Sequence, residues 1–257
     1  MRTNTPNTLK KLIDHPFSKR ILKDSIEIKN ELYENHIKID DAPKRLPNKL
    51  EYYKLDVGFH ISQLFSWCQQ LVNNVYFLRA KSPHSTLNKY KITSYDLLIY
   101  HIENYYIRVQ SMYDRLLNIT NALFFLGNSP ENVTHKIIIE NIFVKQAKLD
   151  TDLKKINKII RDYLGAKRNQ IIHQEGYQDQ KIRDLEFYCL FLDGINIPDE
   201  DVEAKKYIPM EVKAIASEIT NEKFEEFTVF NDKIFSEMNS LFSKYEKIYD
   251  NKINEFS

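Results

Sequence analysis

The scarcity of glycine is the strongest constraint on how this chain can fold. Its 257 residues include only five glycines, and no two lie closer together than Gly165 and Gly176. All-β sandwiches and barrels need turn residues about every ten positions, so the chain lacks the turns for such a fold. Glycine-rich nucleotide-binding loops are excluded too, because they bring several glycines within about six residues. The sequence therefore predicts a protein of long helices.

Charge and cysteine content limit the partners and ligands of the chain. The formal net charge is +1, so any binding of nucleic acid must rest on a local basic patch. Cys68 and Cys189 are too few for a disulfide scaffold or a structural zinc site, and neither an H-E-x-x-H nor an E-x-x-H pair occurs. Neither a bilayer-spanning apolar stretch nor a secretory signal is visible. We expect a cytoplasmic protein with no membrane segment, no metal and no cofactor.

Apolar periodicity predicts four long helices and several short ones. The long ones are expected at Leu50–Arg79, from Ser94 as N-cap to Gly127, at about 151–173, and from about Asn221 to the C-terminus. The last is the final one of one or two helices expected after Pro209. Shorter helices are expected near Ile21–Tyr33, after Thr134 and at 180–193. We predict an all-α fold, an antiparallel four-helix bundle with additional peripheral helices. Residues 1–49 would form a polar N-terminal extension with a short helix, and residues 50–257 the bundle domain.

The helix predicted at 151–173 carries an unusual row opposite its apolar stripe. Gly165, Asn169 and His173 follow one another at intervals of one turn. A glycine inside a helix costs about 1 kcal/mol relative to alanine, and here it would permit the close approach of a ligand or partner. Arg161 flanks this row, and the apolar Ile172 lies beside it. The row is either a solvated helix face or a site at a subunit interface.

A second unusual face is expected on the helix that begins near Ser94. Polar side chains recur there at alternating intervals of three and four residues, a heptad-like pattern: His101, Asn104, Arg108, Ser111, Arg115 and Asn118. We call these six residues the polar seam. It is either a solvated face with local ion pairs or the polar wall of a cleft.

The segment Arg168-Asn169-Gln170-Ile171-Ile172-His173 resembles the signature motif of the HEPN superfamily. In that signature an arginine is followed after four to six residues by a histidine, and a polar residue, often asparagine, stands directly after the arginine. The motif lies near the end of a predicted helix, as it does in the family. The stretch HIENYYIRVQSMYDR, which contains Glu103 and Arg108, is similar to one bacterial HEPN subfamily.

The resemblance implies a metal-independent endoribonuclease, of the toxin–antitoxin or phage-defence type, whose site is a composite of two motifs in a homodimer. His173 would act as general acid or base, Arg168 would stabilise charge on the phosphate, and Asn169 would orient the imidazole or contact substrate. Residues expected to bind RNA or its phosphates are Arg161, Arg108, His101 and Glu103. The implied partners are RNA, a second copy of the chain and a cognate antitoxin.

Two other interpretations remain open. Some HEPN relatives have lost catalysis, so the chain could be a non-catalytic module that binds RNA, nucleotide or a partner protein. Without the resemblance, the polar faces would fit a helical scaffold that binds other proteins. The presence of Arg168, Asn169 and His173 together favours the ribonuclease.

Overall fold

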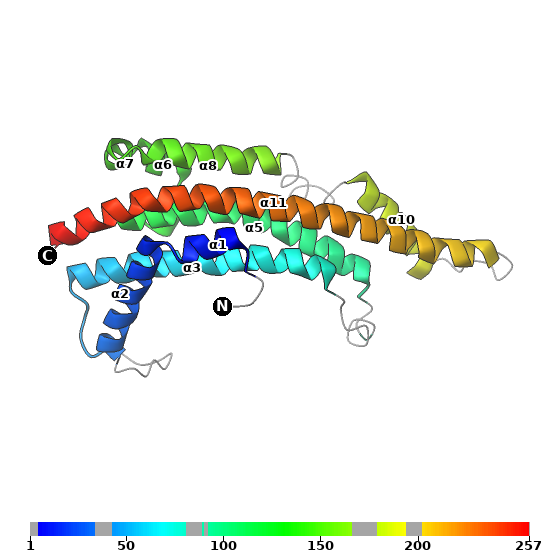
Figure 1. Ribbon diagram of the computed structural model, residues 1–257, viewed down its shortest axis with the longest axis horizontal. Coiled ribbons are helices and arrows are strands. Elements are labelled where there is room, and N and C mark those ends of the chain that lie inside the picture. Colours follow the sequence, from blue (N-terminus) through cyan, green and yellow to red (C-terminus); the bar gives the residue numbers. More distant parts are fainter. Residues whose placement is uncertain are drawn as a thin grey trace. The chain divides into compact units, whose positions relative to one another are not determined.

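The structure is a computed structural model that describes residues 5–33, 43–80, 89, 92–165, 179–193 and 202–256. Within these ranges the protein is all-α, as predicted. Figure 1 shows the helices in chain order, which are α1 (Asn7–Ile13), α2 (Pro16–Tyr33), α3 (Lys49–Arg79), α5 (Ser94–Leu123), α6 (His135–Glu140), α7 (Ile142–Gln146), α8 (Leu149–Leu164), α10 (Gln180–Asp193) and α11 (Val202–Phe256). A 3-10 turn covers Pro130–Asn132. None of the described helices combines the length and the apolar character needed to cross a membrane.

The predicted helices are present, but several of their boundaries differ; α5, for example, ends at Leu123 and not at Gly127. The N-cap of α5 is Thr93 instead of Ser94: the Asp96 amide donates to Thr93 Oγ1 at 3.0 Å, and the Thr93 amide donates to the Asp96 carboxylate at 2.8 Å. The chain after Pro209 forms no separate helices, because α11 is one helix with Pro209 inside it. In the N-terminal extension, α1 and α2 stand where one short helix was expected.

A further difference concerns the helix that was predicted to run to His173. Helix α8 ends at Leu164, and Gly165 has a φ of +47°. This is the left-handed conformation in which helices commonly end, and glycine adopts it without the penalty of a Cβ. The prediction of Gly165 as a residue inside a continuous helix is therefore wrong. The other two members of its row, Asn169 and His173, lie outside the described residues.

The described residues form two compact units. The first unit takes in Met1–Gln70, Val109–Tyr163 and Asp232–Ser257, and the second takes in Leu71–Arg108 and Leu164–Asn231. Helices α3, α5 and α11 contribute residues to both. The domain boundary predicted between residues 49 and 50 stays a prediction. The polar character expected of residues 1–49 is not uniform, because Leu9, Leu12, Phe17 and Ile21 are fully buried in the first unit.

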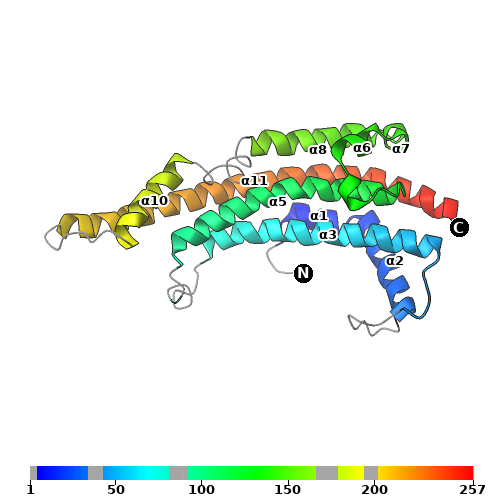
Figure 2. The same cartoon turned by 180° about the vertical axis from the view of Figure 1, so that it is seen from behind.

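In the first unit, successive long helices run antiparallel. The hydroxyl of Tyr53, early in α3, donates to the Leu123 carbonyl at the end of α5, and its ring stacks on Tyr249 near the end of α11 at a centroid distance of 5.6 Å. Helix α8 lies along α11 in both views (Figures 1 and 2), where Lys155 pairs with Glu237 at 2.7 Å. The core of this bundle is rich in aromatic rings, since Phe17 contacts Phe242, Tyr245 and Tyr249.

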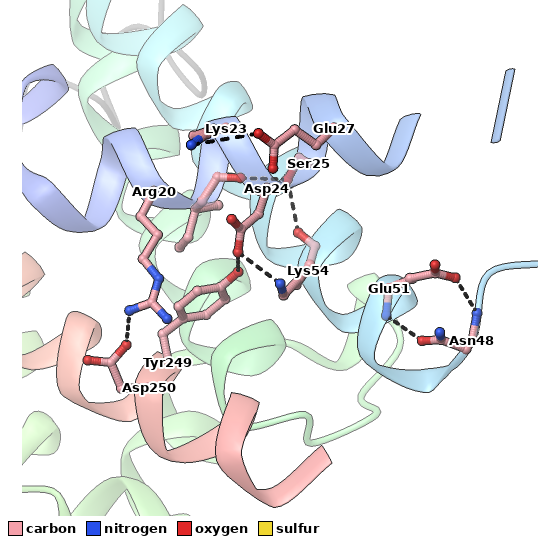
Figure 3. Close-up of polar contacts among 11 residues, drawn as sticks. Arg20, Lys23, Asp24, Ser25, Glu27, Asn48, Glu51, Lys54, Tyr249 and Asp250 are labelled. Atoms are coloured by element: carbon pink, nitrogen blue, oxygen red, sulfur yellow. Dashed lines mark hydrogen bonds and ion pairs between the residues drawn. The ribbon is translucent and has the colours of Figure 1, made fainter. Parts of the chain in front are cut away.

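Helix α2 is joined to the rest of the first unit by a cluster of polar contacts (Figure 3). The Asp24 carboxylate accepts a hydrogen bond from Tyr249 at 3.1 Å and pairs with Lys54 at 3.1 Å. Arg20 pairs with Asp250 of α11. Two elements far apart in sequence, α3 and α11, therefore both bind α2.

Helix α2 also approaches α3 unusually closely at Gly58. A Cβ placed on Gly58 would lie 1.8 Å from Ser25 Oγ and 2.8 Å from Ser25 Cβ. The hydroxyl of Ser25 donates to the carbonyls of Ile21 and Lys54. A serine hydroxyl could rotate away from a new methyl group, but its Cβ moves only with the backbone of α2. Only glycine fits at position 58.

In the second unit, α5 packs against α11 through aromatic rings. Tyr105 stacks on Phe227 at a centroid distance of 3.7 Å and an interplanar angle of 7°, and its hydroxyl donates to Asn231 at 2.9 Å. Arg79, the last residue of α3, lies over the ring of Phe224 at 3.5 Å. Lys181 of α10 pairs with Glu218 of α11 at 2.7 Å.

Gly58→Ala is expected to destabilise the protein by about 1–3 kcal/mol, the usual cost of forcing extra volume into a packed interface. Chemical denaturation followed by circular dichroism measures this loss. Ser25→Ala in the Gly58→Ala background should recover part of it, because Ser25 Oγ is the nearest atom. A Gly58→Ala protein as stable as wild type, or more stable, would show that α2 and α3 do not approach this closely.

Candidate functional site

The motif residues of the predicted ribonuclease site, Arg168, Asn169 and His173, lie outside the described residues, as does Ile172. Their roles stay predictions. The structure describes the other candidate site residues, and it places them in different compact units. His101, Glu103 and Arg108 lie on α5 in the second unit, whereas Arg161 lies on α8 in the first.

The polar seam of α5 is half-buried along its whole length. It is therefore not a fully solvated face. In the second unit the ring of His101 packs against the ring of Phe77 on α3, with the centroids 5.2 Å apart. In the first unit the guanidinium of Arg115 lies over the Trp67 ring of α3 at 3.8 Å. Within each unit, then, part of the seam contacts α3.

Two amide side chains connect Arg108 to α3. The Nε of Arg108 donates to Asn104 Oδ1 at 2.9 Å, and the Nδ2 of Asn104 donates to Asn74 Oδ1 at 3.4 Å. Asn74 is only 4% exposed, so this series of contacts begins in the interior. The guanidinium of Arg108 keeps its charge at all physiological pH values. The polar seam therefore contains a permanent positive charge, and the Nε of Arg108 is hydrogen-bonded to the neutral side chain of Asn104.

His101 is the seam residue whose protonation is most affected by its surroundings. Burial lowers the pKa of its imidazole, and its Nδ1 is buried without a hydrogen-bond partner among the described residues. A neutral ring is therefore favoured at pH 7. In that form His101 can stack or exchange hydrogen bonds with a ligand, but it adds no positive charge to the site.

Glu103 is half-buried on α5, one turn before Ile107. Arg161, in contrast, is exposed in the last turn of α8, and it forms no ion pair or hydrogen bond with a described residue. An exposed guanidinium without a partner can bind a phosphate at little cost in desolvation. The two candidate RNA-binding arginines therefore differ in their surroundings. Arg108 makes local contacts in a helix interface, whereas Arg161 is open to solvent.

Sequence reasoning missed a polar contact close to Arg161 in the first unit. Tyr113 of α5 shares a hydrogen bond with the Nδ1 of His135, the first residue of α6. The pKa of His135 is lowered by burial first, and then by the positive charges of Lys154 and Arg161 on α8. No spacing in the sequence joins Tyr113 to His135 and Arg161, because these residues come from three helices.

The family to which the chain belongs follows from a comparison with family models. Residues 12–246 match the model of the HEPN_Cthe2314-like HEPN family. The match covers most of the chain, so this protein is a member of that family and has an all-α HEPN fold. Comparison with curated proteins found no match, and neither did comparison with solved structures.

We expect His101 to contribute to loss of stability in mild acid. Its folded-state pKa lies below the ordinary value of 6.5, so the unfolded chain binds the proton more tightly. The folded state therefore loses stability as the pH falls below about 6.5 and the unfolded imidazole becomes charged. His101→Phe keeps the ring contact with Phe77 and removes the titration.

Urea denaturation of both proteins between pH 7.5 and pH 5 measures this difference. The free energy of unfolding of the His101→Phe protein should fall less steeply toward acid pH than that of wild type. A smaller dependence should remain, because burial also lowers the pKa of His60 and His135. Identical pH dependence in the two proteins would contradict a depressed pKa at His101.

Proposed function

We propose that this protein is a metal-independent endoribonuclease of the HEPN type. The observation that carries the proposal is the combination of family membership over residues 12–246 with an R-N-x-x-x-H motif at Arg168–His173 inside the matched region. A HEPN protein without catalysis has no chemical need to keep the arginine, the asparagine and the histidine together. We infer that it acts on RNA in a toxin–antitoxin or phage-defence setting.

The proposed reaction uses the 2′-hydroxyl of RNA as the nucleophile. This oxygen attacks the adjacent phosphorus, the bond to the 5′-oxygen breaks, and the products are a 2′,3′-cyclic phosphate and a 5′-hydroxyl. One proton leaves the 2′-hydroxyl and one is added to the leaving oxygen, and an imidazole can perform either transfer near pH 7. His173 takes this role. Arg168 stabilises the phosphorane-like charge with its guanidinium, and Asn169 orients the imidazole or contacts substrate.

The proposed site is completed by a second copy of the chain. One motif supplies one imidazole and one guanidinium, whereas the reaction moves two protons and develops charge on the phosphate. A two-fold axis places each residue near its symmetry mate, so a homodimer brings two motifs to one cleft. Arg108, Arg161, His101 and Glu103 are proposed to bind RNA or its phosphates. A cognate antitoxin is the proposed protein partner.

Removal of the motif side chains is the direct test. His173→Ala should lower the rate of RNA cleavage about 10²–10⁴-fold, the usual contribution of a positioned general acid or base, and Arg168→Ala should also abolish most of it. Purified protein is incubated with total RNA in EDTA, and the fragment ends are analysed. Arg183→Ala, which removes an exposed arginine of α10, is the matched control and should cleave like wild type.

Three results would refute this assignment. The first is an unchanged rate in either motif variant. The second is cleavage that requires added magnesium and leaves 5′-phosphates, because this would indicate a different enzyme class. The third is wild-type protein that binds RNA but never cuts it, which would identify the non-catalytic HEPN module.

The composite site makes activity depend on protein concentration. Below the dissociation constant of the dimer, the rate of cleavage per chain should fall as the protein is diluted, because monomers lack half of the site. Light scattering coupled to size-exclusion chromatography, run on the same dilution series, measures the fraction of dimer. A constant rate per chain across the monomer–dimer transition would eliminate the composite site while leaving the ribonuclease proposal intact.

A further inference from the structure

Three cations form a row along one face of α8. Lys154, Lys158 and Arg161 are separated by four and three residues, so at about 100° per residue their side chains lie within a narrow sector of the helix. All three are exposed. The buried residues of α8 lie on a different side, and they are Leu149, Leu153, Ile156, Ile160 and Leu164. We call Lys154, Lys158 and Arg161 the basic row.

Two of the three side chains in the basic row have no ion-pair partner among the described residues. Lys154 pairs with Asp150 at 2.9 Å. Lys158 and Arg161 form no ion pair or hydrogen bond with any described residue. Two other acidic residues lie near the row in sequence. Asp152 pairs with Lys244 of α11, and Asp162 is displaced by about 100° from Arg161 around the helix. Two charges on one helix face that no described residue pairs are notable in a chain whose total formal charge is only +1.

His135 adds a hydrogen-bond donor close to this row. Tyr113 is buried, and burial raises the pKa of its hydroxyl, so the phenol stays protonated and can donate to His135 Nδ1. The pKa of His135 is lowered by burial and by Lys154 and Arg161, which favours the neutral imidazole. A neutral ring that accepts at Nδ1 carries its proton on Nε2. Its N–H is then directed away from Tyr113.

Two cations and a neutral N–H donor are a combination suited to phosphate oxygens. We propose that the basic row and His135 bind the phosphate backbone of single-stranded RNA, as a contact surface additional to the Arg168–His173 motif. The choice of RNA among polyanions rests on the proposed ribonuclease function. The sequence requires any RNA affinity to come from a local patch, and the basic row of α8 satisfies this requirement.

The test measures binding of a fluorescein-labelled oligouridylate by fluorescence anisotropy over a series of salt concentrations. The parent is the full chain with His173→Ala, which prevents cleavage during the measurement. Lys158→Gln and Arg161→Gln are combined in one variant. The matched control combines Lys233→Gln and Lys247→Gln, which remove two exposed lysines of α11 from the same compact unit.

Loss of two phosphate contacts should reduce the slope of log affinity against log salt by about 1.4 and weaken binding about tenfold near physiological salt. The control pair should leave both quantities unchanged. His135→Ala should weaken binding several-fold without altering the slope, because a neutral donor releases no counterion. His135→Gln keeps an N–H donor and should restore most of that loss.

The proposal is overturned if the row variant binds like the control pair, or if its affinity falls with no change in slope. It is also overturned if the parent fails to bind RNA even at low salt, in which case the row is a surface for a protein or for solvent. Cleavage of RNA by the wild-type chain is measured in a separate assay. RNA binding that depends on the row in a protein that never cuts RNA defeats the ribonuclease proposal alone, whereas cleavage with an irrelevant row defeats only the surface.

Discussion

The apolar stripe of α11 is the feature on which the described fold depends. Its buried side chains recur at intervals of three and four residues along one side, at Phe227, Phe230, Ile234, Met238, Leu241, Tyr245 and Tyr249. In the second unit this stripe stacks on Tyr105, and in the first it meets Tyr53 and Phe17. Burial of such large side chains stabilises by roughly 1.5–3 kcal/mol each. The single bond lost at Pro209, which costs about 3 kcal/mol, is small beside that sum.

Helix existence could be predicted from the sequence, because apolar periodicity over long segments is a strong signal. The errors in the predicted helix boundaries arose where a single residue determines whether a helix begins, ends or continues. Gly165 follows an apolar stripe that continues beyond it, so periodicity suggested a longer helix, although glycine after a basic last turn is also a stop signal. Pro209 suggested a break, but the long stripe that follows it keeps α11 continuous. Thr93 and Ser94 have similar capping strength, but only Thr93 has an acidic residue three positions later, so the capping-box pattern with Asp96 was the overlooked signal.

The candidate site could be predicted only in part, because several of its contacts join residues that are far apart in the sequence. The R-N-x-x-x-H motif is local in sequence, so it is visible without any structure. Contacts between helices are not local: Asn74 lies thirty residues before Asn104, and Tyr113 lies twenty-two before His135. The heptad-like spacing of the polar seam indicated an unusual face, but it could not reveal that α3 covers part of it.

The contacts around Arg108 have a consequence for the thermodynamics of recognition. An arginine side chain has many rotamers, and ordering it on a ligand costs about 0.5–1.5 kcal/mol of conformational entropy. In this protein the hydrogen bond from Arg108 Nε to Asn104, itself bonded to the buried Asn74, already restricts the side chain when the chain folds. No described residue restrains the exposed Arg161 in this way. The conformational entropy of the Arg108 side chain is therefore lost when the chain folds. At Arg161 the same loss would occur each time a ligand binds.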